Sequence, residues 1–500
     1  NFIMVNTNMS YEKSKVFLAT ISSVYDDWAP YAAACLISHC MKNEYIKNNY
    51  EFLEPEYRHK WDDIEFNMNL LKTDILGLTC YVWNQVANDK IAKRFKSYNP
   101  DGIVIYGGPN VPEENLEDYK REFVDHYVTG PGELKFEKIL DANSDSVYTL
   151  PTPYIDGILD NILSKDIAVA FETTRGCPYH CAFCDWGGVA RSKIKKVEDD
   201  DVYKTLNHIL KFKVKRLEFL DANYGIFARD VDFVKYIAEN KQRDDMALTF
   251  AGFTKNGSKW MTDIMNIIMN NFNDRMRSVK ISLQTLTPEV LEVIDRNNIK
   301  PEKLLSILDD LKDIDVSSEL ILGLPGETAN SWADTLFKHQ DLGIDFARSY
   351  PLYVLPNTPM SKKEYREKYK IKTKKIILPD GETFEMIYEC YSYDLEEITK
   401  IYLTWLYFNT FYNFGLDKTI SKESLKDFLI NPPAVMQLHE VKESLYRIFK
   451  PEESFCLEGY DLKYLHHHLG RGRELIYMKN AGYKIRNPDK ELQSPFAVIK

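Results

Sequence analysis

The sequence predicts an α/β protein in three parts: a Rossmann-like domain over residues 1–150, a partial (β/α)6 barrel over 151–370, and a mostly helical part over 371–500. Two observations carry this prediction. Apolar strand-like runs alternate with helix-period segments through the first two parts, and such alternation is typical of βαβ units with a parallel sheet. The third part is rich in aromatic residues, and its strand signal is confined to one hairpin pattern.

In the first part, four apolar runs read as strands: KVFLATIS, TDILGLTCYVW, DGIVIYGGPNV and VDHYVTG. The segments YAAACLISHCMKN and NQVANDKIAKRFKSY between them have the period of a helix. The spacing predicts parallel strands joined by helices.

The second part follows a linker with two prolines, YTLPTPYIDGILD (148–160), and contains six strand-like runs up to about residue 360. Six such strands in succession predict a sheet that curls toward a barrel. The third part begins with a predicted hairpin, KKIILPDGETFEMIYE, with Pro-Asp-Gly at its turn. The aromatic helix predicted over 395–416 is interpreted as packed core.

Composition limits the classes of function. The chain of 500 residues has a net charge of −11 and a pI near 5.6, without a dense basic stripe, which argues against a nucleic-acid surface. No run approaches the roughly 20 apolar residues of a membrane span, and the first residues do not resemble a secretory signal. Few, unevenly spaced cysteines indicate a reducing cytoplasm. Five of them are interpreted as core thiols: Cys35, Cys40, Cys80, Cys390 and Cys456.

Three of the eight cysteines lie in one loop, directly after the strand IAVAFETT: Cys177, Cys181 and Cys184. Chance clustering of core thiols is disfavoured because the residues between them form no apolar face. A structural zinc site needs four ligands, and the nearest fourth ligand, His180, lies within the loop itself. An iron–sulfur cluster with three thiolates and one open iron is favoured, since an open coordination position serves catalysis.

This loop resembles the radical S-adenosylmethionine (SAM) superfamily, in which Cys-x-x-x-Cys-x-x-Cys, with an aromatic residue (here Phe183) before the last cysteine, ends the first barrel strand. The resemblance implies a [4Fe–4S] cluster whose open iron binds SAM. It also implies that one electron from an external flavodoxin- or ferredoxin-type donor cleaves SAM to a 5′-deoxyadenosyl radical, which abstracts hydrogen from a substrate.

The resemblance carries SAM contacts to later strand ends. Besides Phe183, it implies Asp221 and Asn223 near the amino end of SAM, Gln284 at the ribose or carboxylate, and Glu319 and Leu324 of ELILGLPGET beside the adenine and ribose. YVLPNTPM (353–360) would border the adenine. The family's Gly-Gly-Glu is absent after the second strand, and for each position an ordinary barrel strand and turn is the alternative.

The first part resembles the cobalamin-binding domain that precedes one large radical SAM class. The residues that this resemblance implies as cobalamin contacts lie in three loops: Thr79, Tyr81, Val82, Trp83 and Asn84; Gly107, Gly108 and Pro109; and Gly130, Gly132 and Glu133. Such loops follow strands, where ligands of open α/β sheets bind. A domain that binds another nucleotide is the alternative, although no Gly-x-Gly-x-x-Gly follows the first strand.

Many cobalamin carriers have an Asp-x-His-x-x-Gly loop whose histidine ligates cobalt. The corresponding loop here, SSVYDDWAPYAA (22–33), has no histidine, and His39 is interpreted as an ordinary helical residue. The sequence therefore predicts base-off cobalamin without a histidine ligand, with Trp83 nearest the lower face of the corrin.

Together these features predict a cytoplasmic C-methyltransferase that uses one SAM to methylate cobalamin and a second to make the radical. A small molecule or peptide is the expected substrate, and no acid–base pair is required. A cobalamin-dependent rearrangement or cyclisation is the alternative among enzymes, and a methylthiotransferase is disfavoured because no second three-cysteine set is present. A cobalamin sensor or carrier is the alternative of another class. A metal site at His466–His468 is disfavoured because consecutive helical positions point about 100° apart.

Overall fold

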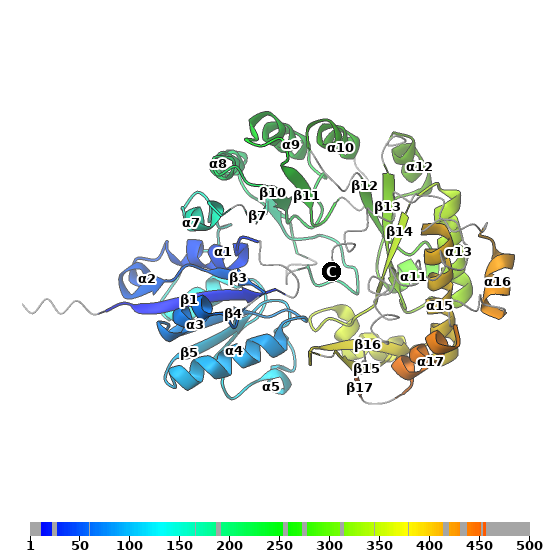
Figure 1. Cartoon of the computed structure of the whole chain (residues 1–500), viewed down its shortest axis with the longest axis horizontal. Helices are drawn as coiled ribbons and strands as arrows, with labels where there is room; N and C mark the ends of the chain where they lie inside the picture. The colour runs from blue at the N-terminus through cyan, green and yellow to red at the C-terminus, as the bar shows by residue number, and fades with distance from the viewer. Residues whose placement is uncertain are drawn as a thin grey trace, which may run out of the picture. The chain divides into compact units, whose positions relative to one another are not determined.

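The computed structural model (Figure 1) describes residues 12–22, 28–59, 61–165, 167–186, 192–253, 259–272, 278–310, 315–344, 346–378, 380–413, 420–430, 438–451 and 454–456. The chain divides into two compact units, residues 1–170 with 200–214 and residues 171–199 with 215–500. The predicted C-terminal part, residues 371–500, thus shares a unit with five of the six barrel strands and the last residue of β7. The three-part division drawn from the sequence stays a prediction, and His466–His468 lie outside the described residues.

A parallel sheet forms the centre of the first unit, with strand order β2-β1-β4-β5-β6 and β3 beside β1. Its strands are β1 (Ser14–Ile21), β2 (Tyr50–Phe52), β3 (Glu56–Arg58), β4 (Ile75–Thr79), β5 (Ile103–Gly107) and β6 (His126–Val128). Its helices are α1 (Tyr31–Cys40), α2 (Glu44–Asn49), α3 (Ile64–Leu71), α4 (Gln85–Tyr98), α5 (Leu116–Tyr119), α6 (Glu133–Leu140), α7 (Asp160–Leu163) and most of α8 (Asp199–Leu210).

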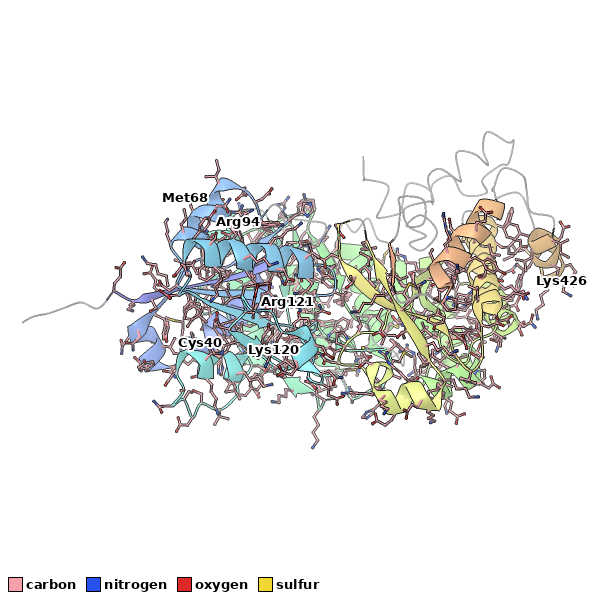
Figure 2. All side chains as sticks on the ribbon, turned by 90° about the horizontal axis from the view of Figure 1, so that it is seen from below. Cys40, Met68, Arg94, Lys120, Arg121 and Lys426 are labelled. Atoms are coloured by element: carbon pink, nitrogen blue, oxygen red, sulfur yellow. The ribbon has the colours of Figure 1, made fainter. Side chains whose placement is uncertain are left out.

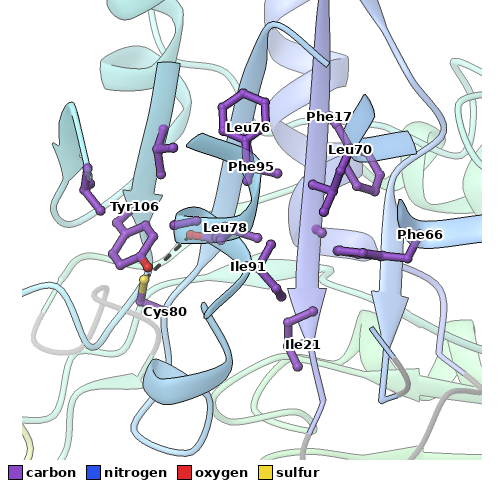
Figure 3. Close-up of a cluster of buried hydrophobic side chains, with 14 of the residues drawn as sticks. Phe17, Ile21, Phe66, Leu70, Leu76, Leu78, Cys80, Ile91, Phe95 and Tyr106 are labelled. Atoms are coloured by element: carbon purple, nitrogen blue, oxygen red, sulfur yellow. Dashed lines mark hydrogen bonds between the residues drawn. The ribbon is translucent and has the colours of Figure 1, made fainter. Parts of the chain in front are cut away.

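Helices cover both faces of this sheet. Alternate residues of a strand point to opposite sides, and in β1 the residues on both sides are apolar and need to be covered. Phe17 and Ile21 of β1 join one apolar core with Phe66 of α3 and Phe95 of α4 (Figure 3). The other core contains side chains of α1 and α6, together with Val16 and Leu18. The predicted parallel α/β arrangement is confirmed.

A buried pair connects α1 with α6 in the second core. His39 Nε2 lies 2.8 Å from Glu137 Oε2, and both side chains are nearly inaccessible. Burial alone would raise the pKa of Glu137, but hydrogen bonds from Asn43, Ser146, Ser144 and His39 lower it below its ordinary value. His39 is thus an internal residue of α1, as the sequence indicated.

One side of α3 is apolar and exposed. Ile64, Met68 and Leu71 lie at helical spacing on it, and Figure 2 shows Met68 projecting from the first unit.

The six predicted barrel strands are confirmed, as two parallel sheets of three strands among the described residues. Their orders are β7-β10-β11 and β12-β13-β14. The strands are β7 (Ala168–Phe171), whose last residue opens the second unit, β10 (Arg216–Phe219), β11 (Ala247–Phe250), β12 (Ser278–Gln284), β13 (Asp315–Leu322) and β14 (Phe346–Pro351). The helices between them are α9 (Arg229–Asn240), α10 (Lys259–Asn271), α11 (Pro288–Val293), α12 (Pro301–Asp310) and α13 (Ala329–Asp341), and most of them lie outside the arc of strands in Figure 1.

The 3₁₀ turn Pro359–Ser361 and α14 (Lys363–Lys368) follow β14 and lie at the end of the range predicted for the barrel. The predicted hairpin is confirmed as antiparallel β15 (Lys372–Ile377) and β16 (Thr383–Glu389), and β17 (Ser454–Cys456) adds to β15. The helices are α15 (Leu395–Phe408), continued by a π-helical turn at Asn409–Asn413, α16 (Lys422–Ile430) and α17 (Leu438–Phe449). Every residue of α15 from 401 to 408 is buried, which confirms the packed core predicted for this segment. In the described part of the chain, no helix combines the length and apolarity of a membrane span.

Candidate active site

The three-cysteine loop leaves the carboxyl end of β7 through a short antiparallel pair, β8 (Thr174–Arg175) with β9 (Lys195–Lys196). Gly176 begins the loop with φ of +108°, and a Cβ there would lie 2.6 Å from the carbonyl oxygen of Lys193. The loop can therefore approach its neighbouring segment only with glycine at this position.

The cysteines of this loop are thiols, not disulfides. Cys177 and Cys181 are buried and Cys184 is partly exposed, whereas His180, the alternative zinc ligand, is exposed. Among the described residues, no group of three His, Cys, Asp or Glu side chains could hold a metal ion. Thiolates of a [4Fe–4S] cluster ligate different irons, so they need not converge on one point.

Backbone hydrogen bonds hold the loop from outside. Ala182 N donates to the carbonyl of Ile294 at 2.9 Å, and Met360 N donates to the carbonyl of Ala182 at 3.1 Å. Within the loop, Cys184 N donates to the carbonyl of Cys181 at 3.1 Å. The residue that follows α11 and the 3₁₀ turn Pro359–Ser361 thus support the cysteine loop.

Asp221 holds the turn that leads into the loop. Its Oδ1 accepts from the hydroxyls of Thr173 and Thr174 at 2.7 and 2.6 Å, and its Oδ2 accepts from Thr173 N at 3.0 Å. Burial raises the pKa of Asp221, and these hydrogen bonds oppose the shift. Both carboxylate oxygens are engaged within the protein, whereas the sequence predicted a contact with SAM, which stays a prediction.

Two buried side chains direct N–H groups at cysteine sulfurs. Asn223 Nδ2 lies 3.3 Å from Cys177 Sγ, and Arg296 Nη1 lies 3.7 Å from Cys181 Sγ. Asn223 Oδ1 has no hydrogen-bond partner among the described residues. This arrangement fits a [4Fe–4S] cluster held by the three thiols. Hydrogen bonds to sulfur stabilise thiolate ligands, and two of the three sulfurs have an N–H donor beside them.

Sequence reasoning missed Arg296. It lies after α11, far from the cysteines in the chain, and a single arginine after a short helix carries no motif. In the fold its side chain is only 5% exposed, its Nη2 donates to the carbonyl of Ser282, and its Nε donates to Asn298 Oδ1 at 2.8 Å. Burial lowers the pKa of Arg296, and the three neighbouring cysteines oppose this shift.

The other predicted SAM residues lie at or near the carboxyl ends of barrel strands. Gln284 has φ of +65° at a register shift of β12. Glu319 of β13 accepts from Ser282 Oγ at 3.0 Å, and its Oε1 lies 3.5 Å from Lys280 Nζ. Leu324 is fully buried and Phe183 is partly buried. Their contacts with SAM stay predictions.

A segment before and within the first turn of α15, residues 391–397, lies against the loop that follows β13. Tyr393 Oη donates to the carbonyl of Gly323 at 2.7 Å, and Gly326 N donates to Ser392 Oγ at 2.9 Å. Ala329 N donates to Glu397 Oε1 at 2.7 Å. The C-terminal part therefore sets the position of the loop expected to lie beside the adenine.

In the first unit, the loops after β4 and β5 lie in close contact. Cys80 N donates to the carbonyl of Gly107 at 2.6 Å, and Asn110 N donates to the carbonyl of Cys80 at 3.0 Å. Gly108 has φ of +112°, and a Cβ there would lie 2.8 Å from the Cys80 carbonyl oxygen. Among the other predicted contacts of these loops, Pro109 is partly buried.

The loop after β4 presents a pair of stacked rings. Tyr81 and Trp83 lie with centroids 4.5 Å apart and planes 6° apart, and Trp83 is 41% exposed. Val82 between them is partly buried. An exposed aromatic face at the carboxyl edge of a parallel sheet fits a large, flat cofactor such as a corrin.

Two residues predicted to contact cobalamin are engaged inside the protein. The amide of Asn84 donates to the carbonyls of Ile21 and Thr79 and accepts from Tyr81 N at 2.8 Å. The hydroxyl of Thr79 accepts from Thr20 Oγ1 at 3.0 Å.

In the loop after β6, Gly130 has φ of +63°, Gly132 lies beside Leu36, and Glu133 begins α6 as a buried residue. The cobalamin contacts predicted for all three loops stay predictions.

A histidine that the sequence did not bring forward lies at the same edge. His59 follows β3, and its Nδ1 lies 3.2 Å from the carbonyl oxygen of Ser22. Ser22 opens the loop that corresponds to the one from which many cobalamin carriers supply a histidine ligand to cobalt. The parallel pairing of β3 with β1 brings the two together.

Comparison with known proteins agrees with this fold. Residues 171–338 match the radical SAM superfamily. Over 414 residues the chain is 31% identical to the cobalamin-dependent radical SAM methyltransferase TokK of Streptomyces tokunonensis, covering 72% of this chain and 60% of TokK. It is 28% identical over 400 residues to a 2-(S-pantetheinyl)-carbapenam-3-carboxylate methyltransferase of Streptantibioticus cattleyicolor, covering 72% of this chain and 58% of that protein.

The fold is also similar to a solved structure, the radical S-adenosylmethionine methyltransferase TsrM from Kitasatospora setae with cobalamin and a [4Fe–4S] cluster bound. The TM-score is 0.59 at 13% identity, over 94% of this chain and 100% of that one. The match of residues 171–338 thus identifies a radical SAM domain in this chain, and the cysteine loop lies within it. Over 72% of its length the chain is similar to two methyltransferases, of which TokK is named as a cobalamin-dependent radical SAM enzyme, and it spans 60% and 58% of the length of these relatives.

Proposed function

We propose that this chain is a cobalamin-dependent radical SAM enzyme that transfers a methyl group to an unactivated carbon of its substrate. The observation that carries the proposal is the loop of Cys177, Cys181 and Cys184 at the carboxyl end of a parallel barrel strand, with N–H donors directed at two of the sulfurs. The likeness over 72% of the chain to two methyltransferases, one of them named as a cobalamin-dependent radical SAM enzyme, supports methyl transfer over the other outcomes.

When bound, the [4Fe–4S] cluster supplies the electron that cleaves SAM, and cobalamin supplies the methyl group. The three cysteines would hold the cluster. Asn223 Oδ1, a buried acceptor with no partner among the described residues, suits the amino group of SAM better than Asp221, whose oxygens accept from Thr173 and Thr174. Gln284 and Glu319 would complete the contacts with SAM at neighbouring strands.

Within the first unit, the stacked rings of Tyr81 and Trp83 would cover the lower face of the corrin. These rings would offer no nitrogen ligand to a bound cobalamin and would thereby favour its base-off form. The protein's contribution is to orient the cofactors and exclude water from the reacting groups.

The substrate is expected to be a small molecule or a peptide, and the reductant a flavodoxin- or ferredoxin-type protein. The first compound to test is 2-(S-pantetheinyl)-carbapenam-3-carboxylate, because a relative carries it in its name.

The experiment combines metal content with product analysis. Anaerobically reconstituted protein should hold about four irons, and Cys177→Ala, Cys181→Ala and Cys184→Ala should each abolish the cluster. Cys390→Ser, at a buried cysteine outside the loop, is the matched control and should retain it. Full iron content and SAM cleavage in all three loop variants would contradict the assignment.

Methyl transfer is tested with SAM deuterated in its methyl group. With the true substrate, S-adenosylhomocysteine and 5′-deoxyadenosine should form in comparable amounts, and the label should appear on a carbon of the product. 5′-Deoxyadenosine without S-adenosylhomocysteine, and without a mass increase, would instead support rearrangement or cyclisation.

A further inference from the structure

Two buried N–H donors reach the cysteine loop from distant parts of the chain. Asn223 follows β10 and directs its amide nitrogen at Cys177 Sγ, 3.3 Å away, while Arg296 follows α11 and directs a guanidinium nitrogen at Cys181 Sγ, 3.7 Å away. Their side chains are 4% and 5% exposed. Neither donor lies within the three-cysteine motif, so both contacts depend on the tertiary fold.

The physical effect of such donors on a cluster has a definite sign. An N–H group directed at a thiolate sulfur withdraws electron density from it, and hydrogen bonds to the sulfurs are among the factors that set the potential of iron–sulfur clusters. Reduction adds one negative charge to the cluster, so each donor stabilises the reduced state more than the oxidised state. A buried positive charge acts more strongly than a neutral amide, because the interior screens charge less than water.

We propose that Asn223 and Arg296 are positioning residues that raise the reduction potential of the cluster held by Cys177, Cys181 and Cys184. This inference rests on the proposed function, in which these cysteines hold a [4Fe–4S] cluster. The step concerned is the transfer of one electron from an external reduced flavodoxin or ferredoxin to the oxidised cluster, with no bond made or broken in the protein. The proposal assigns the larger effect to Arg296 and the smaller one to Asn223.

Substitutions at the two donors can separate this role from a purely structural one. Arg296 is held by the carbonyl of Ser282 and by Asn298, which orient its guanidinium toward the cysteine. Arg296→Gln removes the charge, and Arg296→Lys keeps it. Asn223→Leu removes the N–H group at similar side-chain volume.

The test is an anaerobic redox titration of the reconstituted full chain, with the reduced cluster measured by EPR. Arg296→Gln should lower the ratio of reduced to oxidised cluster at a fixed solution potential about tenfold, which corresponds to a shift of about 59 mV for a one-electron couple. Asn223→Leu should shift the potential in the same direction by less, and Arg296→Lys should stay closer to the wild type than Arg296→Gln.

Matched controls come from the first unit. Asn88→Leu removes another buried amide–thiol contact, in which Asn88 Nδ2 lies 3.5 Å from Cys80 Sγ. Arg121→Gln removes an arginine that is paired with Asp89 at 3.2 Å. Both should leave the cluster potential unchanged.

Unchanged potentials in Asn223→Leu and Arg296→Gln, at full iron content, would overturn the inference and leave the proposed function intact. A wild type that takes up no iron would overturn the proposed function and the inference with it. If Arg296→Gln fails to hold iron, Arg296→Lys decides the charge effect: a potential close to the wild-type value supports it, and a potential lowered by about 59 mV or more contradicts it.

Discussion

Replacing Gly108 with alanine should strain the contact between the loops after β4 and β5. The residue has φ of +112°, which costs a non-glycine residue about 1–2 kcal/mol. The added Cβ would also lie 2.8 Å from the carbonyl oxygen and 3.0 Å from the nitrogen of Cys80. These backbone atoms are held by hydrogen bonds to Gly107 and Asn110, and losing one of them costs about 1 kcal/mol more. The expected loss of stability is therefore about 2–3 kcal/mol.

Gly130→Ala is the matched control. Gly130 also has positive φ, +63°, but among the described residues a Cβ there would meet only Glu113 Oε1, at 3.4 Å. Its expected cost is about 1 kcal/mol. Urea denaturation measures the loss of stability of both variants. Hydrogen exchange of peptides covering 75–84 and 103–111 shows whether the loops after β4 and β5 are the segments that become less protected. Equal stability of the two variants would refute the steric argument. A weaker binding of cobalamin by folded Gly108→Ala than by the wild type would further support a cobalamin site at the loops after β4 and β5.

The remaining predictions concern protonation and the cobalt ligand. Burial lowers the pKa of His339 to about 4, so stability should fall as the pH drops from 6.5 toward 4, by about 3 kcal/mol, and unfolding curves of His339→Gln should lack this dependence. Burial raises the pKa of Asp230 to about 6, so stability should fall as the pH rises from 3.8 through 6; Asp230→Asn, which keeps the acceptor for Gly225 N and Phe227 N, should be the more stable protein at pH 8 and no more stable at pH 3. Bound cobalamin should be base-off, and His59→Ala should leave its EPR spectrum unchanged; nitrogen hyperfine splitting that disappears in that variant would identify His59 as a cobalt ligand.

Local patterns of the sequence were sufficient to predict the succession of strands and helices along the chain and the cysteine loop. The run FLATI of β1 is a nearly continuous apolar stretch, which predicts a strand that is buried on both faces. Strands of a parallel sheet have this pattern because helices cover both faces of the sheet. The three cysteines stand out by their spacing alone. These features depend on neighbours in the chain, so no tertiary information was needed to find them.

Features that depend on distant contacts were out of reach. Nothing near Arg296 in the sequence indicates that its guanidinium lies beside Cys181, because their contact joins positions 115 residues apart. The same holds for Asp221, whose engagement by Thr173 and Thr174 is visible only when two barrel strands are placed side by side. His59 was missed because the short strand before it has little periodicity to mark it.

The contacts of residues 391–397 with the loop after β13 bear on how this chain can be divided. A protein shortened to end at residue 370 would lose three hydrogen bonds of the loop after β13: the donor to the carbonyl of Gly323 and the acceptors for Gly326 N and Ala329 N. The barrel strands should therefore not be expressed without residues 391–397. Chimeras that exchange C-terminal parts between relatives, in order to change the substrate, should place the junction after residue 397 and keep this segment with its own barrel.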